Sequence, residues 1–285
     1  MTKYNIGIFH YQLGHTDGVS LEIEKWKVVF EELGHKVFYC AGDLGSAEGT
    51  LVEEMYHHIP EIETLNHNTF KALRDFTPDE YKKELYSWVD RIEAKFRQFV
   101  IDNEINFIIP QNVWCVAANP AVAIALERVR REFNLPTLVH NHDFYWERTD
   151  GFCLTCPAAV ELADKFLPPR DPAIKHAVIN SLGQKELMER KSIPSTVVPN
   201  VFDFDMPGWA EDEYNRDFRE QIGLKETDIV FLQATRVVAR KGIELAIDHI
   251  GEQWELWCLD EDRVEEMRKE LPRFLDEHPE DGQLR

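Results

Sequence analysis

Hydrophobic residues recur with two different periods along the first 200 residues of the chain. The short apolar run YNIGIF ends in the polar loop HYQLGHTDG. Apolar residues then follow at steps of three and four, the spacing of one helix face, at Val19, Ile23, Trp26, Phe30 and Leu33. Gly34 can take the left-handed conformation that ends a helix, and KVFYC is a second apolar run. The pattern predicts a strand, a helix and a strand.

The same alternation continues downstream. A long helical pattern from Leu85 to Phe99 leads into the apolar run INFIIP. A helix that begins with Asn119 and Pro120 precedes the predicted strand PTLVH. The strand HAVIN then precedes a helix that we expect Ser181 and Gln184 to open as a capping box, and STVVPN closes the series.

Alternating strands and helices, with strands apolar on both faces, predict an α/β fold with a doubly wound parallel sheet of Rossmann type. We assign this domain to residues 1–201. Residues 202–226 are polar, contain Pro207 and Gly208, and indicate a connector with a short helix. The pattern restarts with DIVFLQATR, so residues 227–285 are expected to form a partial second α/β unit.

Charge narrows the classes of partner. The chain has 32 Lys and Arg residues and 52 Asp and Glu residues, a formal net charge of −20. This balance argues against nucleic acid or an anionic membrane as the main partner. Residues up to Val201 carry 21 basic and 29 acidic side chains, so most of the excess negative charge lies in the last third. A small anion can still be held by a local basic pocket.

The cysteine pattern and the N-terminus favour a cytoplasmic protein. The five cysteines lack the spacing of a disulfide framework, which suits a reducing compartment. Cys153 and Cys156 form a CxxC pair without a second pair for zinc, so we interpret them as two thiols in a loop and expect no metal. No charged and apolar leader precedes the first strand, and no window approaches the roughly 18 apolar residues of a membrane span.

In a doubly wound sheet, ligands bind beyond the carboxyl ends of the strands, so the loops that follow strands are searched first. The first loop, HYQLGHTDGVS, offers Gly14, Gly18 and the N–H groups of a helix start. It lacks the GxGxxG fingerprint of dinucleotide binding, and Gly18 fits a tight turn as well as a ligand site. The second loop presents Gln111 and Asn112, which can bind sugar hydroxyls or tie the loop together; the structural interpretation is slightly favoured.

The third loop, VHNHDFYWERTD, is the densest polar cluster of the sequence. Two histidines, an aspartate and neighbouring aromatic residues at the end of a strand indicate a site for a polar, ring-shaped ligand. Its members are His140, His142, Asp143, Phe144, Tyr145, Trp146, Glu147 and Arg148. The HNHD spacing also permits a metal, but no further ligands are evident.

The fourth loop, ATRVVARKG, places Arg236 and Lys241 between a strand and a helix start. Two cations beside the positive end of a helix dipole can hold a diphosphate. Arg240 adjoins them and is expected to face solvent, and basic residues in a loop are often only solvated.

The order GHTDGVS, LVHNHDFYWER, NSLGQKEL, VPNVFDFD and TRVVARKGIELAI resembles the family-4 glycosyltransferases of GT-B fold, over nearly the whole chain up to Ile250. VPNVFDFD and the Arg-to-Lys spacing are the more specific elements. The resemblance implies two Rossmann-like domains, the first for the acceptor and the second for a nucleotide-sugar, and transfer with retention without an essential metal or other cofactor.

By that resemblance, Arg236 and Lys241 bind the donor diphosphate and Gly18 lies near it. His142 and Asp143 line the cleft near the reacting sugar as the catalytic candidates. The donor would be a UDP- or GDP-sugar, and the acceptor a sugar or another hydroxyl compound.

The sequence departs from the family in two places. Many relatives carry a histidine at or near Gln111, and no Glu-x7-Glu motif follows Trp254. We therefore expect a truncated donor domain whose open sheet edge favours pairing with a second chain or with itself. The main alternative is a non-catalytic half of a split or degenerate transferase. An epimerase-like enzyme fits the architecture but matches the HNHD and Arg-to-Lys combination less well.

Overall fold

The computed structural model describes residues 2–148, 151–202, 204–205, 210–221, 223–225, 233, 235 and 241–245. The chain divides into two compact units, Met1–Asp203 and Phe204–Arg285. The described part of the second unit includes the short helix α8 (Phe218–Gln221). The α/β unit predicted for residues 227–285 lies almost entirely outside the described residues.

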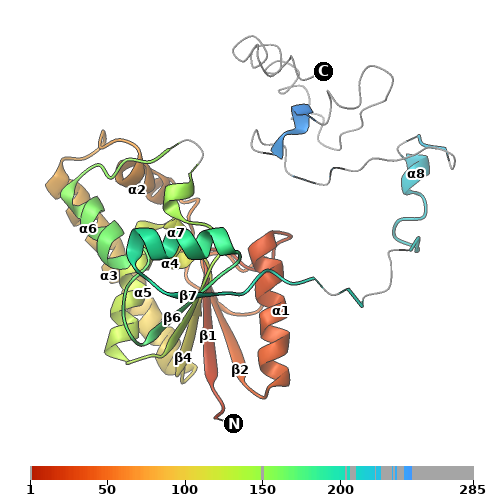
Figure 1. Ribbon diagram of the computed structural model, residues 1–285, viewed down its shortest axis with the longest axis horizontal. Helices are drawn as coiled ribbons and strands as arrows, with labels where there is room; N and C mark the ends of the chain where they lie inside the picture. The colour runs from red at the N-terminus through yellow and green to blue at the C-terminus, as the bar shows by residue number, and fades with distance from the viewer. Residues whose placement is uncertain are drawn as a thin grey trace. The chain divides into compact units, whose positions relative to one another are not determined.

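The first unit is built on a seven-stranded sheet in which every paired strand is parallel (Figure 1). The strands lie in the order β3-β2-β1-β4-β5-β6-β7. Their bounds are β1 Asn5–His10, β2 Lys36–Ala41, β3 Thr50–Leu51, β4 Phe107–Pro110, β5 Thr137–Asn141, β6 Ile174–Val178 and β7 Ser195–Val197. The predicted doubly wound parallel sheet of Rossmann type is confirmed.

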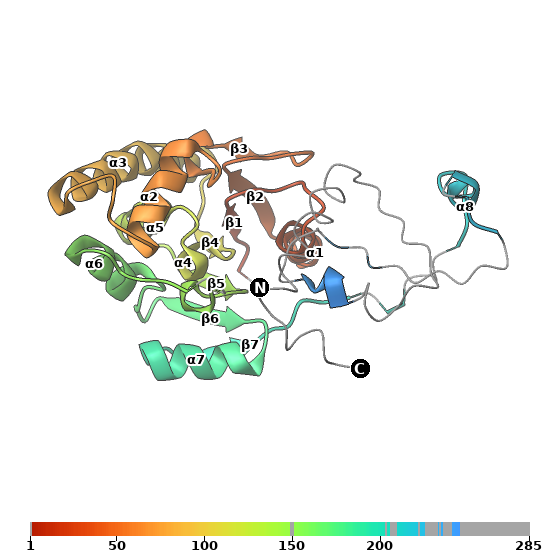
Figure 2. The same cartoon turned by 90° about the horizontal axis from the view of Figure 1, so that it is seen from above.

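Helices cover both faces of this sheet (Figure 2). Their bounds are α1 Gly18–Glu32, α2 Pro60–Phe70, α3 Pro78–Asp102, α4 Val113–Val116, α5 Pro120–Glu132, α6 Pro157–Phe166 and α7 Ser181–Lys191. Two 3-10 turns, η1 (Glu53–Met55) and η2 (Tyr145–Glu147), lie in the loops. None of the described helices is long and apolar enough to cross a membrane.

Alternate residues of β1 divide between two apolar cores. Phe9 packs with α3, its ring centroid 5.1 Å from that of Phe96 and 5.2 Å from that of Phe99. Ile6 and Ile8 lie in a separate cluster that includes residues of α1. The apolar character of both faces follows from this double cover, because a strand between two helix layers buries every side chain.

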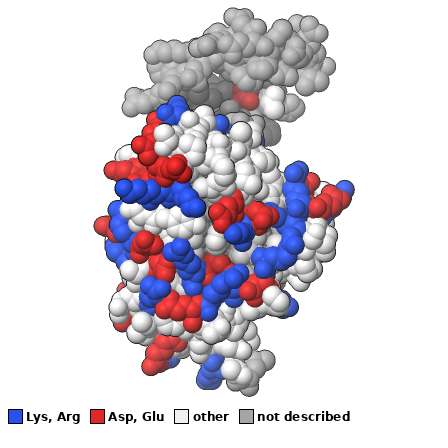
Figure 3. Space-filling view, turned by 90° about the vertical axis from the view of Figure 1, so that its left-hand side faces the viewer, with Lys and Arg blue, Asp and Glu red and all other residues white. Residues whose placement is uncertain are grey.

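One face of the first unit carries paired rather than segregated charges. Figure 3 shows Lys and Arg interspersed with Asp and Glu on one face. Helices α3, α5 and α6 contribute ion pairs such as Arg97–Glu132 and Lys165–Glu161, with N to O distances of 2.6 and 2.7 Å. Exposed pairs of this kind contribute little to stability, so the fold depends on its apolar cores.

The start of α7 differs from the predicted capping box. The N-cap is Asn180, whose Oδ1 accepts a hydrogen bond from Gly183 N at 2.8 Å. The Gln184 side chain turns away from the helix start and donates to Ser195 O at 2.7 Å. Asn180 therefore caps the helix and Gln184 ties it to β7, while Ser181 is the first helical residue.

We expect Asn180→Ala to lower the free energy of unfolding by about 1 kcal/mol, because it removes an N-cap acceptor. Ser181→Ala is the matched control and should change it by less than about 0.5 kcal/mol. Urea unfolding of both variants measures this difference. A larger loss for the Ser181 variant would restore the capping box as first predicted.

Candidate functional site

The strand order reverses direction between β1 and β4. The carboxyl ends of the strands at such a reversal are where doubly wound sheets bind their ligands. The β1–α1 loop, the β4–α4 loop and the β5–η2 loop all leave the sheet there. They bring Gly18, Gln111 and His142 to one edge of the sheet. The first three loops singled out in the sequence therefore lie side by side.

His10, the last residue of β1, bridges the reversal. Its Nδ1 lies 2.7 Å from the carbonyl oxygen of Gln111. A carbonyl can only accept a hydrogen bond, so Nδ1 carries the proton and Nε2 is left bare. Burial is the main cause that lowers the pKa of His10 to about 4, which keeps the ring neutral at pH 7.

The Gln111 side-chain amide lies between two further imidazoles. In the amide orientation of the structure, its Oε1 atom lies 3.0 Å from Nδ1 of His140 and 3.1 Å from Nε2 of His142. The His140 and His142 ring centroids are 4.4 Å apart. Burial lowers the pKa of both histidines, that of His142 to about 3. The rings of His10, His140 and His142 are therefore all uncharged at pH 7.

Each neutral imidazole ring carries one proton, and its hydrogen-bond partners show which nitrogen holds that proton. His140 Nε2 lies 3.1 Å from the carbonyl oxygen of Val198, so the single ring proton of His140 is on Nε2 and its Nδ1 is an acceptor. The amide atom beside Nδ1 must then be the NH2 group of Gln111. With the opposite amide orientation, Nε2 of Gln111 is buried without a hydrogen-bond partner among the described residues. Turned toward the rings, the NH2 donates one proton to His140 and one to His142.

This assignment leaves His142 as the Nδ1–H tautomer. Its Nε2 accepts from Gln111, so a neutral ring carries its proton on Nδ1. The site thus contains imidazoles in fixed tautomers that hold no net charge. Such a set suits hydroxyl groups, which donate and accept, better than a bare anion.

One wall of the site is held by α1. The Trp26 indole stacks on His140 with ring centroids 4.5 Å apart, and its Nε1 donates to Glu22 at 3.0 Å. The buried Glu22 carboxylate also accepts from Val201 N at 3.2 Å, and Lys25 donates to Val201 O. Together with the bond from His140 to Val198, these contacts fix the segment 198–201 against α1 and β5.

Gly18 is the first residue of α1 and is exposed. Its φ lies outside the left-handed region, and a Cβ at this position would meet no described atom within 4 Å. Neither backbone conformation nor internal packing requires glycine here, which does not support the tight-turn interpretation. The N-cap residue Asp17 accepts from Val19 N at 3.0 Å and Ser20 N at 3.1 Å.

Asp17 is the charged group of this part of the site. Its other oxygen accepts from Ser20 Oγ at 2.6 Å and from Gln12 Nε2 at 3.2 Å. Although burial opposes ionisation, these hydrogen bonds lower the pKa of Asp17. A carboxylate with four donors is a poor general base, so its role is to hold the helix start.

Asn112 docks the β4–α4 loop onto the β5–η2 loop. It has a left-handed backbone, and its Oδ1 accepts from His142 N and Asp143 N, both at 3.1 Å. These bonds support the structural interpretation of this amide. The Asp143 side chain is exposed at the same edge.

The aromatic residues after Asp143 belong to the fold. Phe144 and Tyr145 are buried, and Phe144 stacks on Trp146 with centroids 4.4 Å apart. Glu147 accepts from Phe144 N at 2.6 Å, and Arg148 donates to Val116 O at 3.1 Å. The stacking surface predicted for a ligand ring is therefore occupied by protein. Among the described residues, no three His, Cys, Asp or Glu side chains are grouped to hold a metal ion.

Sequence reasoning missed His10 and His57. His57 follows η1 in a stretch without a clear period, and its ring centroid lies 5.6 Å from that of Tyr11. His10 is the last residue of an apolar strand and carries no local signal beyond that position. The clue that was available is the position of His10 at the carboxyl end of β1, where a doubly wound sheet is expected to bind its ligand.

Arg236 lies outside the described residues. Lys241 is exposed, and its carbonyl oxygen accepts from Gln233 Nε2 at 3.1 Å. The predicted diphosphate clamp of Arg236 and Lys241 stays a prediction.

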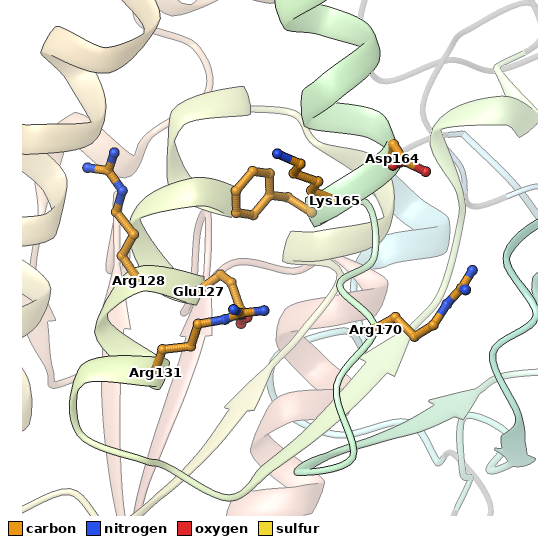
Figure 4. Close-up of a pocket in the computed structure, with 7 residues that line it drawn as sticks. Glu127, Arg128, Arg131, Asp164, Lys165 and Arg170 are labelled. Atoms are coloured by element: carbon orange, nitrogen blue, oxygen red, sulfur yellow. Dashed lines mark hydrogen bonds and ion pairs between the residues drawn. The ribbon is translucent and has the colours of Figure 1, made fainter.

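A separate pocket of about 470 Å³ lies by the carboxyl ends of α5 and α6 (Figure 4). It is lined by Glu127, Arg128, Arg131, Asp164, Lys165, Phe166 and Arg170. Its cations have partners: Arg131 lies 2.5 Å from Glu127 and Arg128 lies 2.9 Å from Glu93. We interpret these charges as structural.

The chain is similar in sequence to two curated proteins. It is 37% identical over 247 residues to the mannosylglucosylglycerate synthase of Petrotoga mobilis, a match that covers 87% of this chain and 56% of the relative. It is 38% identical over 250 residues to the mannosylglucosylglycerate synthase of Thermotoga maritima, covering 86% and 56%. The chain thus spans about half the length of these relatives. No family model matches the sequence.

Solved structures show only distant likeness. The structure of TcCGT1 in complex with UDP has a TM-score of 0.39 at 10% identity, and the match covers 77% of this chain and 55% of that chain. The calicheamicin glycosyltransferase CalG4 has a TM-score of 0.38 at 12% identity, covering 73% and 55%. Likeness at this level carries no weight for the function.

We expect the first unit to lose stability as the pH falls from about 6.5 to 4. The pKa of His10 and of His176 is lowered to about 4 by burial, so the unfolded chain binds protons in this range that the folded chain does not. Each such histidine contributes up to ~1.4 kcal/mol of unfolding free energy per pH unit.

Urea unfolding at several pH values measures this slope. His10→Asn keeps a donor for Gln111 O but removes one titrating group, so its slope should be shallower than that of the wild type. An unchanged unfolding free energy between pH 6.5 and 4.5 would contradict the neutral assignment.

Proposed function

We propose that this chain contains the acceptor-binding domain of a glycosyltransferase of GT-B fold. The observation that carries the proposal is the similarity of 37 to 38% to mannosylglucosylglycerate synthases over most of this chain. The site supports it, because neutral imidazoles at the strand reversal fit an uncharged, hydroxyl-rich sugar ring. The reaction proposed is transfer of a mannosyl group from a nucleotide-sugar to a hydroxyl of glucosylglycerate.

The finer roles are also proposals. Arg236 and Lys241 hold the donor diphosphate and neutralise the leaving nucleotide. His142, with its proton on Nδ1, donates to an oxygen of the reacting sugar, and the exposed Asp143 lies beside it. The transfer retains the anomeric configuration and uses no essential metal.

Gly18 has a steric role in this proposal. Asp17 already occupies the N–H groups of Val19 and Ser20. The helix start therefore offers few free donors to a phosphate. The missing side chain of Gly18 instead lets the donor approach the backbone of α1 closely.

A radiolabelled transfer assay tests the function. Mannose carried on UDP or GDP is supplied with glucosylglycerate, and label should pass into mannosylglucosylglycerate only when both substrates are present. Acceptor binding without transfer would favour the alternative of a non-catalytic half. A chain that neither binds glucosylglycerate nor transfers label would contradict the proposed function.

The clamp is tested by calorimetry with nucleotide diphosphates. Arg236→Ala and Lys241→Ala should each weaken binding by roughly 1.5 to 3 kcal/mol, the range for a charge-assisted hydrogen bond. Arg240→Ala is the control and should leave the affinity unchanged. If all three variants bound nucleotide diphosphate with the affinity of the wild type, the loop would be only a solvated surface and not a clamp.

A further inference from the structure

Glu22 is a buried carboxylate to which the proposed reaction gives no role. Its side chain is only 1% exposed and lies on α1. Its Oε1 accepts from Nε1 of Trp26 at 3.0 Å, and its Oε2 accepts from Val201 N at 3.2 Å and from Lys25 Nζ at 3.4 Å. One carboxylate thus holds both the Trp26 indole and the end of the segment 198–201.

Both of these contacts converge on His140. The Trp26 indole stacks on the His140 ring with centroids 4.5 Å apart and planes at 24°, which restricts the plane of the imidazole. The carbonyl oxygen of Val198, in the same segment as Val201, lies 3.1 Å from His140 Nε2. Glu22 therefore supports the ring plane of His140 and the hydrogen-bond acceptor of its ring proton at the same time.

The Gln111 amide gives His140 and His142 two consistent proton arrangements. Both rings are neutral at pH 7 because burial lowers their pKa, so each carries one proton. In the first arrangement His140 is protonated on Nε2, the Gln111 NH2 donates to both rings, and His142 is protonated on Nδ1. In the second, His140 is protonated on Nδ1, Gln111 Oε1 accepts from both rings, and His142 is protonated on Nε2. A change of tautomer at His140 therefore reverses the tautomer of His142.

The position of the Val198 carbonyl separates the two arrangements in energy. In the second, this oxygen faces a bare Nε2 of His140 at 3.1 Å, and two acceptors at that distance repel each other. Gln111 Nε2 is then also buried without a hydrogen-bond partner among the described residues. The first arrangement is favoured as long as the carbonyl is held in place, and Glu22 holds the segment through Val201.

We propose that Glu22 is a positioning residue that keeps these side chains in the first arrangement, so that His142 presents an Nδ1–H and not a bare Nδ1 to the bound sugar. The inference rests on the proposed function, which assigns this proton to a sugar oxygen. Glu22 acts through Trp26, the segment 198–201 and His140 rather than by contact with the sugar.

Glu22→Gln tests the proposal, because one amide oxygen cannot accept on both sides. If that oxygen faces Trp26, the NH2 faces the N–H of Val201, and the reverse orientation takes the acceptor from the indole. Long-range ¹H–¹⁵N correlation at pH 7 should then show a fraction of His142 protonated on Nε2 and an equal fraction of His140 protonated on Nδ1.

Sugar binding should change in proportion. If about a third of His142 keeps its Nδ1–H in Glu22→Gln, the affinity for glucosylglycerate should fall about threefold, the inverse of the competent fraction. Glu24→Gln is the matched control, because Glu24 is an exposed carboxylate on the same helix. It should leave the ring nitrogen signals and the affinity at their wild-type values.

Hydrogen exchange on the wild-type chain gives a measurement that does not depend on a variant folding. The Val201 amide and the Trp26 indole N–H should both exchange at least about tenfold more slowly than in an unfolded chain, because each donates to Glu22. Unprotected exchange at Val201, or unchanged tautomers in folded Glu22→Gln, would overturn the inference. If the wild type binds no glucosylglycerate, the proposed function fails, while the tautomers still show what Glu22 positions.

Discussion

The candidate site depends on one amide, the side chain of Gln111, placed between His140 and His142. Its NH2 group joins the end of β4 to the end of β5, while its backbone carbonyl accepts from His10 at the end of β1. One residue thus connects three strands across the point where the strand order reverses. Each imidazole is held in one tautomer as a result, and none has to carry a charge in a buried position.

That neutrality explains the chemistry proposed for the site. A protonated imidazole would attract phosphate or carboxylate, but burial makes the charged form costly at all three rings. The bare Nε2 of His10 and the Nδ1–H of His142 can instead pair with hydroxyls, each of which donates and accepts. The proposed assignment gives the donor diphosphate to the cations of the Arg236 and Lys241 loop and the sugar hydroxyls of the acceptor to the first unit.

Much of the fold could be predicted from the sequence, because a helix between two apolar runs has a strong local period. The Asn119 start of α5 was predicted, and Asn119 Oδ1 accepts from Ala121 N at 3.1 Å. Helix α2 was missed because its apolar side chains are few. The roles within the cluster after β5 could not be predicted, since His140 is turned toward Trp26 and Val198 by contacts between residues distant in sequence.

The tautomers of the histidines test the central claim most directly. Long-range ¹H–¹⁵N correlation of the ring nitrogens at pH 7 distinguishes a protonated Nδ1 from a protonated Nε2. The network predicts Nδ1–H for His10 and His142, and Nε2–H for His140. A protonated Nε2 on His142, or a doubly protonated His140, would show that the Gln111 amide does not donate to both rings and would contradict the account.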